Sequence, residues 1–462
     1  MPELPEVETV RQVLSSLIIK ATITDVEILK ERIVTTPLDQ FKSRLIGATF
    51  ERIDRIGKYL IFYFDRDLIL VSHLRMEGKY IEILPGETLS RFARVVFTLK
   101  DGRKLCYDDS RQFGTMTLIE SHELASLKGL TKLGPEPFEA ETQEVYQRFL
   151  KSSRPVKELL LDQTVMTGLG NIYADEVLFL SSLHPQYPAN KVSKDKVEEI
   201  IKHAITVLNQ AIMAGGSTIR TYHPGNGITG DFQTHLNVYG RQYQPCFICG
   251  HKLKKIFVGG RGSTYCPHCQ RRDDAPLLIA ITGLIGAGKS TVGSHLKSRG
   301  HKVYDADLIV RELYRDKKVT KLLEKRLNVV LHHKGSFQRE LLKEALVIDV
   351  KLIKKVEDFI HPLVKEKIIE IIKNSDDKVI FCEVPLVFSH KIYELFDYII
   401  GVETDKATQE KFLLARGKTV IVTPDQQYIK NRVKLDKIII NNGSIKKLYH
   451  DVDKVLIALD IK

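Results

Sequence analysis

Short apolar runs rich in β-branched and aromatic residues recur through residues 1–130. They lie at 59–64, 68–72, 95–99 and 116–119, and turn residues separate them. This pattern predicts β-strands. An apolar spacing of three and four residues over roughly 6–17 predicts a helix ahead of them. The first part of the chain is therefore expected to be β-rich.

The pattern changes at a cluster of helix breakers, Leu133-Gly134-Pro135-Glu136-Pro137. Residues 140–213 then show helical periodicity, with turns at 168–170 and at His184-Pro185. A segment rich in Gly, Thr and Asn, 215–230, predicts a mobile loop. A helical domain is expected to follow the β-rich one.

From Leu277 the pattern becomes a strand, a glycine-rich loop and a helix, followed by alternating helices and apolar strands at 379–382, 398–402 and 437–440. This order is typical of an α/β domain with a parallel sheet. The chain is therefore predicted to be multidomain. The expected domains are a β-rich domain at 1–132, a helical domain at 133–235, a cysteine-containing hairpin at 236–272 and an α/β domain at 275–462.

Composition narrows the class of protein. A hydrophobic fraction of 43% and a charged fraction of 28% are ordinary for soluble globular domains. No apolar run is long enough to span a bilayer, and the acidic N-terminus is unlike a signal peptide. Four of the six cysteines form CxxC pairs, which favours metal binding over disulfides and a reducing, cytoplasmic location.

The net charge of +12 is unevenly distributed. Residues 203–272 contain 8 Lys or Arg residues and 1 acidic residue. A basic module on a nearly neutral body fits a nucleic-acid interface. The lysines of the second half are explained equally well as solvated surface charge.

The cysteine pairs have the spacing of a zinc site. Cys246-x2-Cys249 and Cys266-x2-Cys269 lie 16 residues apart. Two such turns complete a tetrahedral Zn²⁺ site, and four protein ligands make it structural. Between them lies a basic hairpin whose Gly-Gly-Arg-Gly turn places Arg261 at the tip, where backbone and guanidinium can approach a phosphate.

The N-terminus offers a nucleophile. Removal of Met1 would expose the secondary amine of Pro2, which titrates near ~8 and can form an iminium with a sugar C1′. Glu3 could shuttle protons beside it. Taken alone, this segment is more often an extended cap before a helix.

The second half contains a phosphate-binding loop. Its residues follow a strand and open a helix: Gly283, Gly286, Ala287, Gly288, Lys289, Ser290 and Thr291. Backbone amides there cradle phosphates, Lys289 reaches the β/γ oxygens of ATP, and Ser290 binds Mg²⁺. The loop alone does not separate a GTPase from a kinase, but no guanine-recognition signature follows it.

Further segments carry a resemblance over 1–272. They are Met1–Val10, Gly57–Leu60, His73–Gly78, Leu133–Pro137, Leu161–Gln163, Gly168–Glu176, Gly215–Thr218 and the cysteine hairpin. In this order they resemble the formamidopyrimidine-DNA glycosylases rather than the endonuclease VIII group. The resemblance implies excision of oxidised purines from double-stranded DNA and β,δ-elimination at the abasic site.

The resemblance also implies residue roles. Pro2 would be the Schiff-base nucleophile, Glu3 a proton donor, Lys58 a participant in β-elimination and Arg261 a phosphate ligand in δ-elimination. The hole left by a flipped nucleotide would be filled by Met76, Arg111 and Phe113. Asn171 and Lys157 would lie on the DNA-facing surface, and the 217–230 loop would cover the everted base. Arg91 and Arg94 stand where the family has a His-x-His phosphate contact, and Gln112 replaces a common basic residue.

The second half resembles dephospho-coenzyme A kinase over about 277–462. The resemblance rests on the phosphate loop, Val303–Asp307, Arg339, His361-Pro362, Pro385–Phe388 and Ile440–Gly443. It implies transfer of the γ-phosphoryl of ATP to the ribose 3′-hydroxyl of dephospho-coenzyme A. Asp307 would be the base, Arg339 and His361 would face the substrate, and Arg416 would be a lid arginine.

The kinase resemblance has departures. Gln338, Phe412 and Ser389 replace an Asp, an Arg and a Glu of the family pattern, and the lid after Arg416 is short. Two alternatives therefore stay open: a degenerate nucleotide sensor and a nucleoside monophosphate kinase. The oligomeric state does not follow from the sequence. We expect the two halves to fold separately, so that replacing Cys266 would leave the kinase fold intact.

Overall fold

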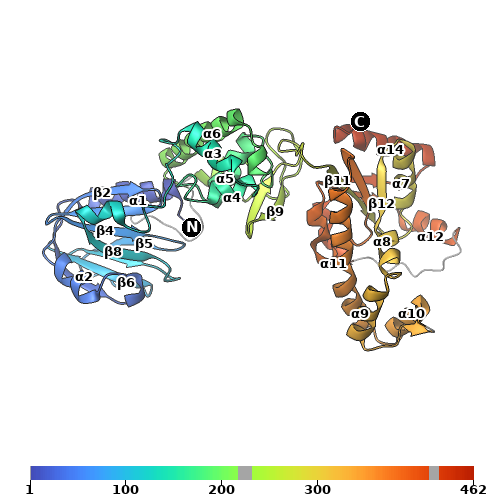
Figure 1. Cartoon of the computed structure of the whole chain (residues 1–462), viewed down its shortest axis with the longest axis horizontal. Helices are drawn as coiled ribbons and strands as arrows, with labels where there is room; N and C mark the ends of the chain where they lie inside the picture. Colours follow the sequence, from blue (N-terminus) through green and yellow to red (C-terminus); the bar gives the residue numbers. More distant parts are fainter. Residues whose placement is uncertain (1, 217–231, 334, 416–425, 462) are drawn as a thin grey trace. The chain divides into compact units, whose positions relative to one another are not determined.

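The computed structural model describes residues 2–216, 232–333, 335–415 and 426–461 (Figure 1). The chain forms two compact units. The first comprises Met1–Gln242 and Lys255–Tyr265, and the second comprises Tyr243–Lys254 and Cys266–Lys462. The boundary between these compact units runs through the cysteine hairpin.

The first unit begins with helix α1 (Leu4–Ile18). The helix starts two residues before the predicted position because Glu3 and Glu6 form a capping box and Pro5 is tolerated in a first turn. The Glu6 carboxylate accepts a hydrogen bond from the Glu3 backbone N–H at 2.9 Å. The cap fixes Glu3 at the point where the chain enters the helix.

Two four-stranded antiparallel sheets follow, in the strand orders β1-β6-β7-β5 and β2-β3-β4-β8 (Figure 1). Their strands are β1 (Ile23–Ile28), β2 (Phe50–Ile56), β3 (Tyr59–Phe64), β4 (Leu68–His73), β5 (Lys79–Ile83), β6 (Ala93–Leu99), β7 (Lys104–Asp108) and β8 (Thr115–Glu120); helix α2 (Leu38–Leu45) lies between β1 and β2 in the chain. The predicted β-rich domain and its helix are confirmed.

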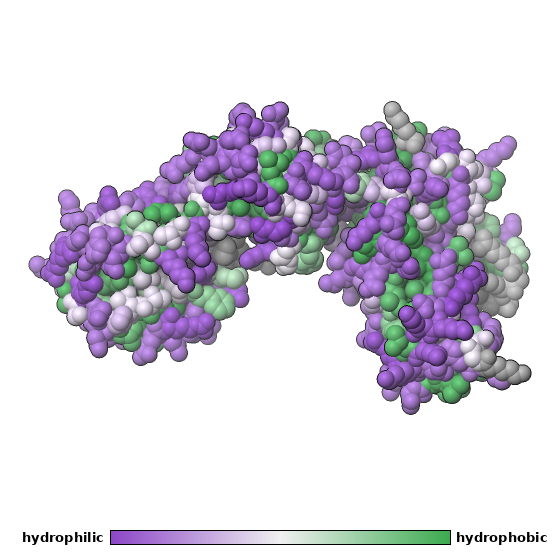
Figure 2. Space-filling view, in the orientation of Figure 1, coloured by the Kyte–Doolittle hydropathy of each residue, from purple (hydrophilic) through white to green (hydrophobic). Residues whose placement is uncertain are grey.

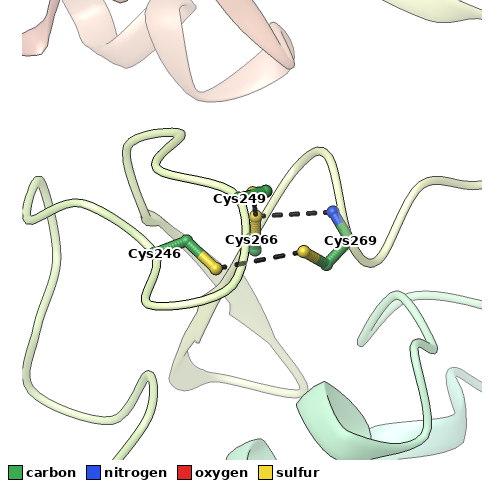
Figure 3. A group of neighbouring side chains, drawn as sticks. All are labelled: Cys246, Cys249, Cys266 and Cys269. Carbon is green, nitrogen blue, oxygen red and sulfur yellow. Dashed lines mark hydrogen bonds between the residues drawn. The ribbon is translucent and has the colours of Figure 1, made fainter.

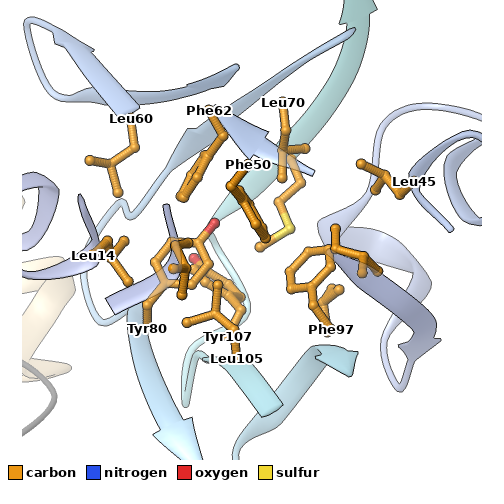
Figure 4. Packing of buried hydrophobic residues seen from close by; sticks show 14 of the residues in the cluster. Leu14, Leu45, Phe50, Leu60, Phe62, Leu70, Tyr80, Phe97, Leu105 and Tyr107 are labelled. Atoms are coloured by element: carbon orange, nitrogen blue, oxygen red, sulfur yellow. The ribbon is translucent and has the colours of Figure 1, made fainter. Parts of the chain in front are cut away.

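Both sheets and α1 share one hydrophobic core (Figure 4). Aromatic rings from the two sheets meet there: the Phe62 and Tyr80 centroids are 5.4 Å apart, and those of Tyr80 and Tyr107 are 5.1 Å apart. Since α1 contributes Val7, Val10 and Leu14 to the same cluster, the N-terminus is anchored to the sheets by apolar packing.

The helical part of the first unit comprises α3 (Thr142–Leu150), α4 (Val156–Leu161), α5 (Asn171–Leu180) and α6 (Lys194–Met213). These helices enclose a second core that also includes Leu4 of α1. The hairpin of β9 (Lys254–Val258) and β10 (Arg261–Tyr265) turns at Gly259 and Gly260, whose φ values are 54° and 73°. Such positive φ angles favour glycine.

The second unit is built on a parallel five-stranded sheet in the order β12-β15-β11-β16-β17. The strands are β11 (Leu277–Gly283), β12 (Lys302–Asp305), β15 (Val379–Glu383), β16 (Tyr398–Glu403) and β17 (Lys437–Ile440). Its helices are α7 (Lys289–Ser298), α8 (Ala306–Leu313), α9 (Lys317–Leu327), α10 (Arg339–Ile348), α11 (Lys351–Lys373), α12 (Lys406–Leu414), α13 (Gln426–Asn431) and α14 (Ile445–Ala458), and a short hairpin pairs β13 (His332–His333) with β14 (Ser336–Phe337). The predicted parallel α/β fold is confirmed.

Residues that follow the first CxxC turn contact the segment before β17 within the second unit. Lys254 forms an ion pair of 2.8 Å with Asp436, and both side chains are largely buried. Lys252 donates hydrogen bonds to the carbonyl oxygens of Leu435 at 2.5 Å and Val433 at 3.1 Å. These contacts join the segment between the cysteine turns to the α/β domain.

Hydrophilic side chains cover most of the visible face of each unit (Figure 2). Among the described residues, every helix is too short or too polar to cross a membrane.

Candidate active sites and zinc finger

The N-terminus meets the start of helix α5. The Glu3 carboxylate accepts hydrogen bonds from the backbone N–H groups of Gly170 at 2.7 Å and Ile172 at 2.9 Å. Burial raises the pKa of Glu3 to about 7, and the nearby Glu6 raises it further, while the charge of Lys58 and the two backbone N–H groups oppose the rise. The helix N-terminus thus holds a carboxyl group that carries its proton part of the time at neutral pH.

Glycine is required around this carboxyl group. A Cβ on Gly170 would lie 2.3 Å from the Glu3 carboxyl carbon. Gly168 has a φ of 102°, and its Cβ would lie 2.5 Å from the Leu4 side chain. The sequence Gly168-Leu169-Gly170 therefore permits the N-terminal segment to lie directly on the turn before α5.

Lys58 faces the same turn from the loop between β2 and β3. Its Nζ donates a hydrogen bond of 2.6 Å to the Leu169 carbonyl oxygen, and the side chain is buried. Burial lowers the pKa of Lys58 to about 8; the carboxylates of Glu3 and Glu6 oppose this shift, and Arg261 adds to it. Glu3 and Lys58 are close enough for each charge to shift the pKa of the other, and buried Pro2 is adjacent in the chain.

A salt-bridge network fixes the Lys58 loop. Arg55 pairs with Glu136 at 2.5 Å and with Glu8 at 3.2 Å. Glu136 also accepts a hydrogen bond from the Gly57 backbone N–H at 2.8 Å. The Leu133–Pro137 segment therefore holds the loop from the other side, a role that its breaker composition alone did not indicate.

The loops of the three void-filling candidates, Met76, Arg111 and Phe113, converge. Buried Asp109 accepts backbone hydrogen bonds from Arg111 at 2.9 Å and from Phe113 at 2.9 Å. The Phe113 ring is 43% exposed, and the Arg111 guanidinium lies 5.0 Å from its centroid. Met76 is half-buried.

Tyr107 connects these loops. A Cβ on Gly78, which ends the Met76 loop, would lie 2.1 Å from the Tyr107 hydroxyl oxygen. A Cβ on Gly114, which follows Phe113, would lie 1.7 Å from the same oxygen. Both loops therefore rest on one buried side chain. Asp109 and Tyr107 are positioning residues that sequence reasoning missed.

The basic hairpin is tied to α4 and α5. Asn171 donates through Nδ2 to the Gly262 carbonyl oxygen at 3.0 Å. Lys157 is fully buried and forms an ion pair of 2.7 Å with Asp175, besides donating to the Gly262 carbonyl oxygen at 3.0 Å and the Ser263 hydroxyl at 2.9 Å. The expectation that Lys157 lies on the DNA-facing surface is wrong, because its ammonium anchors the hairpin from inside. Arg261 remains exposed.

Arg94 is also buried. Its Nε donates to the Asp109 carbonyl oxygen at 2.8 Å, and its Nη1 donates to the Ala93 carbonyl oxygen at 3.0 Å. It therefore supports the Asp109 loop, whereas neighbouring Arg91 is exposed. The 217–230 loop lies outside the described residues.

The four cysteines converge as predicted (Figure 3). The sulfurs of Cys246 and Cys269 are 3.9 Å apart, and those of Cys249 and Cys266 are 3.5 Å apart. All four lie within 4.8 Å of one another. Tetrahedral Zn–S bonds of about 2.3 Å place sulfurs roughly 3.8 Å apart, so these residues fit one structural Zn²⁺.

The phosphate-binding loop has the expected context between β11 and α7. Lys289 donates to the carbonyl oxygens of Gly283 at 2.9 Å and Leu284 at 3.0 Å. Gly288 caps α7 with a φ of 102°, and its Cβ would lie 2.3 Å from the Asn441 side chain. Asn441 in turn donates to the Ala287 carbonyl oxygen at 2.9 Å. The loop is therefore braced from the end of β17.

Glu383 is a candidate that sequence reasoning missed. It ends β15 and lies in register with Ile281 of β11 and Asp305 of β12. Ser290 hydrogen-bonds its carboxyl group. Burial raises the pKa of Glu383, and the charge of Asp305 raises it further. A buried acid ending the apolar run Val379–Cys382 is the signal that could have pointed to it, since Mg²⁺ sites collect oxygen ligands at this sheet edge.

The remaining kinase candidates are spread over several elements. Asp307 is exposed in the first turn of α8, where its backbone N–H donates to Asp305 at 2.8 Å. Arg339 is exposed and begins α10, and His361 lies within α11. Arg416 and the lid lie outside the described residues.

Four family models match the chain in this order. Residues 1–116 match the formamidopyrimidine-DNA glycosylase N-terminal domain and 133–223 match its H2TH domain. Residues 244–272 match a zinc finger found in FPG and IleRS, and 277–447 match dephospho-CoA kinase.

Similar proteins cover the first half. A formamidopyrimidine-DNA glycosylase of Bacillus anthracis is 46% identical over 276 residues, which are 59% of this chain and 100% of that protein. A glycosylase of Lactiplantibacillus plantarum is 44% identical over 273 residues, again 100% of its length. The solved complex of Lactococcus lactis Fpg with abasic-site DNA is 39% identical, with a TM-score of 0.57 over 59% of this chain and 100% of that one. The chain therefore belongs to the formamidopyrimidine-DNA glycosylase family and carries a dephospho-CoA kinase domain after its zinc finger.

Proposed function

We propose that the first half removes oxidised purines, such as 8-oxoguanine and formamidopyrimidines, from double-stranded DNA and cleaves the resulting abasic site. The observation that carries this proposal is the pairing of Glu3, with a pKa raised to about 7, and Lys58, with a pKa lowered to about 8, beside Pro2. Both groups gain or lose a proton within about a unit of neutral pH, which suits them to acid–base chemistry.

The reaction begins at Pro2 once Met1 has been removed. The amine lone pair attacks C1′, the glycosidic bond breaks, and the base leaves with a proton. Glu3 protonates the ring oxygen, which opens the sugar and gives an iminium on Pro2. Loss of the C2′ proton, with Lys58 taking part, expels the 3′-phosphate. Loss of the C4′ proton then expels the 5′-phosphate, which Arg261 holds.

Met76, Arg111 and Phe113 supply lesion recognition in this proposal. Apolar side chains replace the stacking lost when a nucleotide is flipped, and the guanidinium can donate to the unpaired cytosine. The shared support of their loops on Tyr107 and Asp109 favours a joint insertion. The relatives' complexes contain abasic-site DNA and N7-benzyl-Fapy-dG DNA, which supports the same class of substrate.

Borohydride trapping tests the nucleophile. Wild-type protein is expected to become covalently linked to duplex DNA containing 8-oxoguanine, and Pro2→Gly is expected to slow excision. Blocking the N-terminus abolishes the link if Pro2 is the nucleophile. Undiminished trapping with a blocked N-terminus assigns the chemistry to a lysine and contradicts the proposal.

We propose that the second half phosphorylates the 3′-hydroxyl of dephospho-coenzyme A with ATP and Mg²⁺. Lys289 and Ser290 would hold ATP and Mg²⁺, Asp307 would accept the hydroxyl proton, and Arg339, His361 and Arg416 would face the substrate. The support is the braced phosphate loop with Glu383, Asp305 and Asp307 at the carboxyl edge of the same sheet. Carboxylates at this edge suit metal binding and proton acceptance.

Turnover assays separate this proposal from its two rivals. Lys289→Ala and Asp307→Asn are each expected to abolish coenzyme A formation and to leave glycosylase activity unchanged. ATP binding without product would favour the nucleotide-sensor alternative. Phosphorylation of a nucleoside monophosphate in preference to dephospho-coenzyme A would favour the nucleoside monophosphate kinase alternative.

A further inference from the structure

Three side chains of the kinase half form a hydrogen-bonded series. Helix α11 carries Asp358 and His361 one turn apart, and the short 3₁₀ segment Ser389–Leu395 brings His390 against them. His390 Nε2 lies 2.7 Å from an Asp358 carboxylate oxygen. His390 Nδ1 lies 2.9 Å from His361 Nδ1. Both ring nitrogens of His390 are thus engaged.

The protons in this series are determined by the carboxylate. An ionised Asp358 can only accept, so His390 carries a proton on Nε2. In a neutral imidazole the other nitrogen then has a lone pair, and His390 Nδ1 accepts. His361 must therefore donate from Nδ1, which leaves its Nε2 unprotonated. Burial is the largest cause that lowers the pKa of His361, and the charge of Asp358 opposes it; the net lowering agrees with a neutral ring.

The backbone around the three side chains departs from regular helical geometry in both segments. His390 has a φ of 49° and Lys391 a φ of 58°. Two successive residues with a Cβ in the left-handed region are unfavourable and need support from their surroundings. In α11, Pro362 lacks the N–H that would bond the Asp358 carbonyl. Both segments are therefore irregular at the point where the three side chains meet.

We propose that His390, oriented by Asp358, is a positioning residue that fixes the ring and the Nδ1 proton of His361. This inference rests on the proposed kinase function. With Nε2 unprotonated, His361 offers the substrate a hydrogen-bond acceptor. It therefore recognises a donor on dephospho-coenzyme A, a ribose hydroxyl or the adenine amino group, and not a phosphate oxygen.

Steady-state kinetics on the full-length chain tests the positioning role. His390→Ala is expected to raise the KM for dephospho-coenzyme A about tenfold, the effect of one lost hydrogen bond to a fixed group, and to leave the KM for ATP within about twofold. His390→Asn is expected to keep the KM for dephospho-coenzyme A close to the wild-type value, because Asn tolerates a positive φ and its amide can take the place of Nδ1. His450→Ala, an exposed histidine on α14, is the matched control. Equal KM values in His390→Ala and wild type would overturn the inference.

Nitrogen NMR of histidine-labelled protein gives a readout that does not need turnover. His361, assigned with His361→Asn, is expected to show a protonated Nδ1 and an unprotonated Nε2, and to become a mixture of tautomers in His390→Ala. A protonated Nε2 in wild type would overturn the inference. If wild type forms no coenzyme A, the proposed kinase function fails, while the tautomer of His361 still decides the role of His390.

Discussion

At the scale of single residues, environment turns ordinary side chains into acid–base groups. Glu3 and Lys58 are both buried, and burial disfavours the charged form of each. The pKa of the carboxyl group therefore rises and that of the amine falls, so that both pKa values move toward pH 7. Neither shift follows from neighbours in the sequence, since 55 positions separate the two residues.

The pH dependence of excision is expected to report Glu3. In the proposed reaction Glu3 donates a proton, so single-turnover excision should decline as pH rises through about 7. Glu6→Gln removes a negative charge that raises the pKa of Glu3, so the decline should move to lower pH. Tyr173→Phe is the control: it removes the 2.6 Å hydrogen bond to Glu6 but keeps the charge. An unchanged decline in Glu6→Gln would show that another group controls this limb.

At the scale of elements, the N-terminus of helix α5 positions the Glu3 carboxyl group in the glycosylase half. Its N-terminal N–H groups bind a carboxylate that is supplied by a different helix. The arrangement works only because glycine at 168 and 170 lets the two helices approach. The N-terminus of helix α10 in the kinase half lacks such a partner from its cap residue, because the side chain of N-cap Gln338 makes no capping hydrogen bond.

Gly170→Ala should displace the Glu3 carboxyl group, because the added methyl would lie 2.3 Å from it. We expect excision to fall by about a hundredfold, as for loss of a positioned acid, in a protein that still folds. Gly129→Ala, whose Cβ would lie 3.2 Å from the Tyr59 hydroxyl, is the control and should have a much smaller effect. Single-turnover excision rates provide the measurement, and wild-type rates in Gly170→Ala would contradict the role given to this turn.

Gln338→Asp should stabilise the start of α10 by about 1 kcal/mol, because Asp caps helices and Gln does not. Gln338→Glu adds the same charge with a longer side chain and should give less. Thermal unfolding of the kinase half measures both. If the two variants are equally stable, charge and not capping explains the gain.

At the scale of the whole molecule, residues of the zinc finger fall in both compact units. Its hairpin supports the glycosylase site through Lys157 and Asn171. Lys252 and Lys254, which follow the first CxxC turn, contact Leu435 and Asp436 beside the last strand of the kinase sheet. Since Zn²⁺ binding supplies folding free energy, we expect loss of Zn²⁺ to lower the stability of the kinase half as well.

Hydrogen exchange can test this coupling. Cys246→Ser or chelation of Zn²⁺ is expected to increase amide exchange in β16 and β17, because Lys254, between the cysteine turns, contacts Phe396 and Asp436 just before these strands. Strand β12 lies at the opposite edge of the sheet and should change least, which makes it an internal control. Unchanged exchange in β17 would mean that the contacts of Lys252 and Lys254 contribute little to the stability of the kinase sheet.

The sequence by itself determined the chemistry that local motifs encode. The CxxC pairs, the phosphate loop and the strand patterns each depend on residues close in the chain, because coordination geometry and hydrogen-bond periodicity act over a few residues. These predictions and the order of the domains agree with the structure and the family matches.

Tertiary structure alone decided which distant groups meet. It turned Lys157 inward, added Glu383 to the phosphate loop, joined His390 to His361 and assigned the cysteine turns to the kinase unit. A charged residue looks the same in a sequence whether it faces solvent or a buried partner. Its burial and its pKa depend on segments that pack against it from far along the chain, and only the folded molecule determines those contacts.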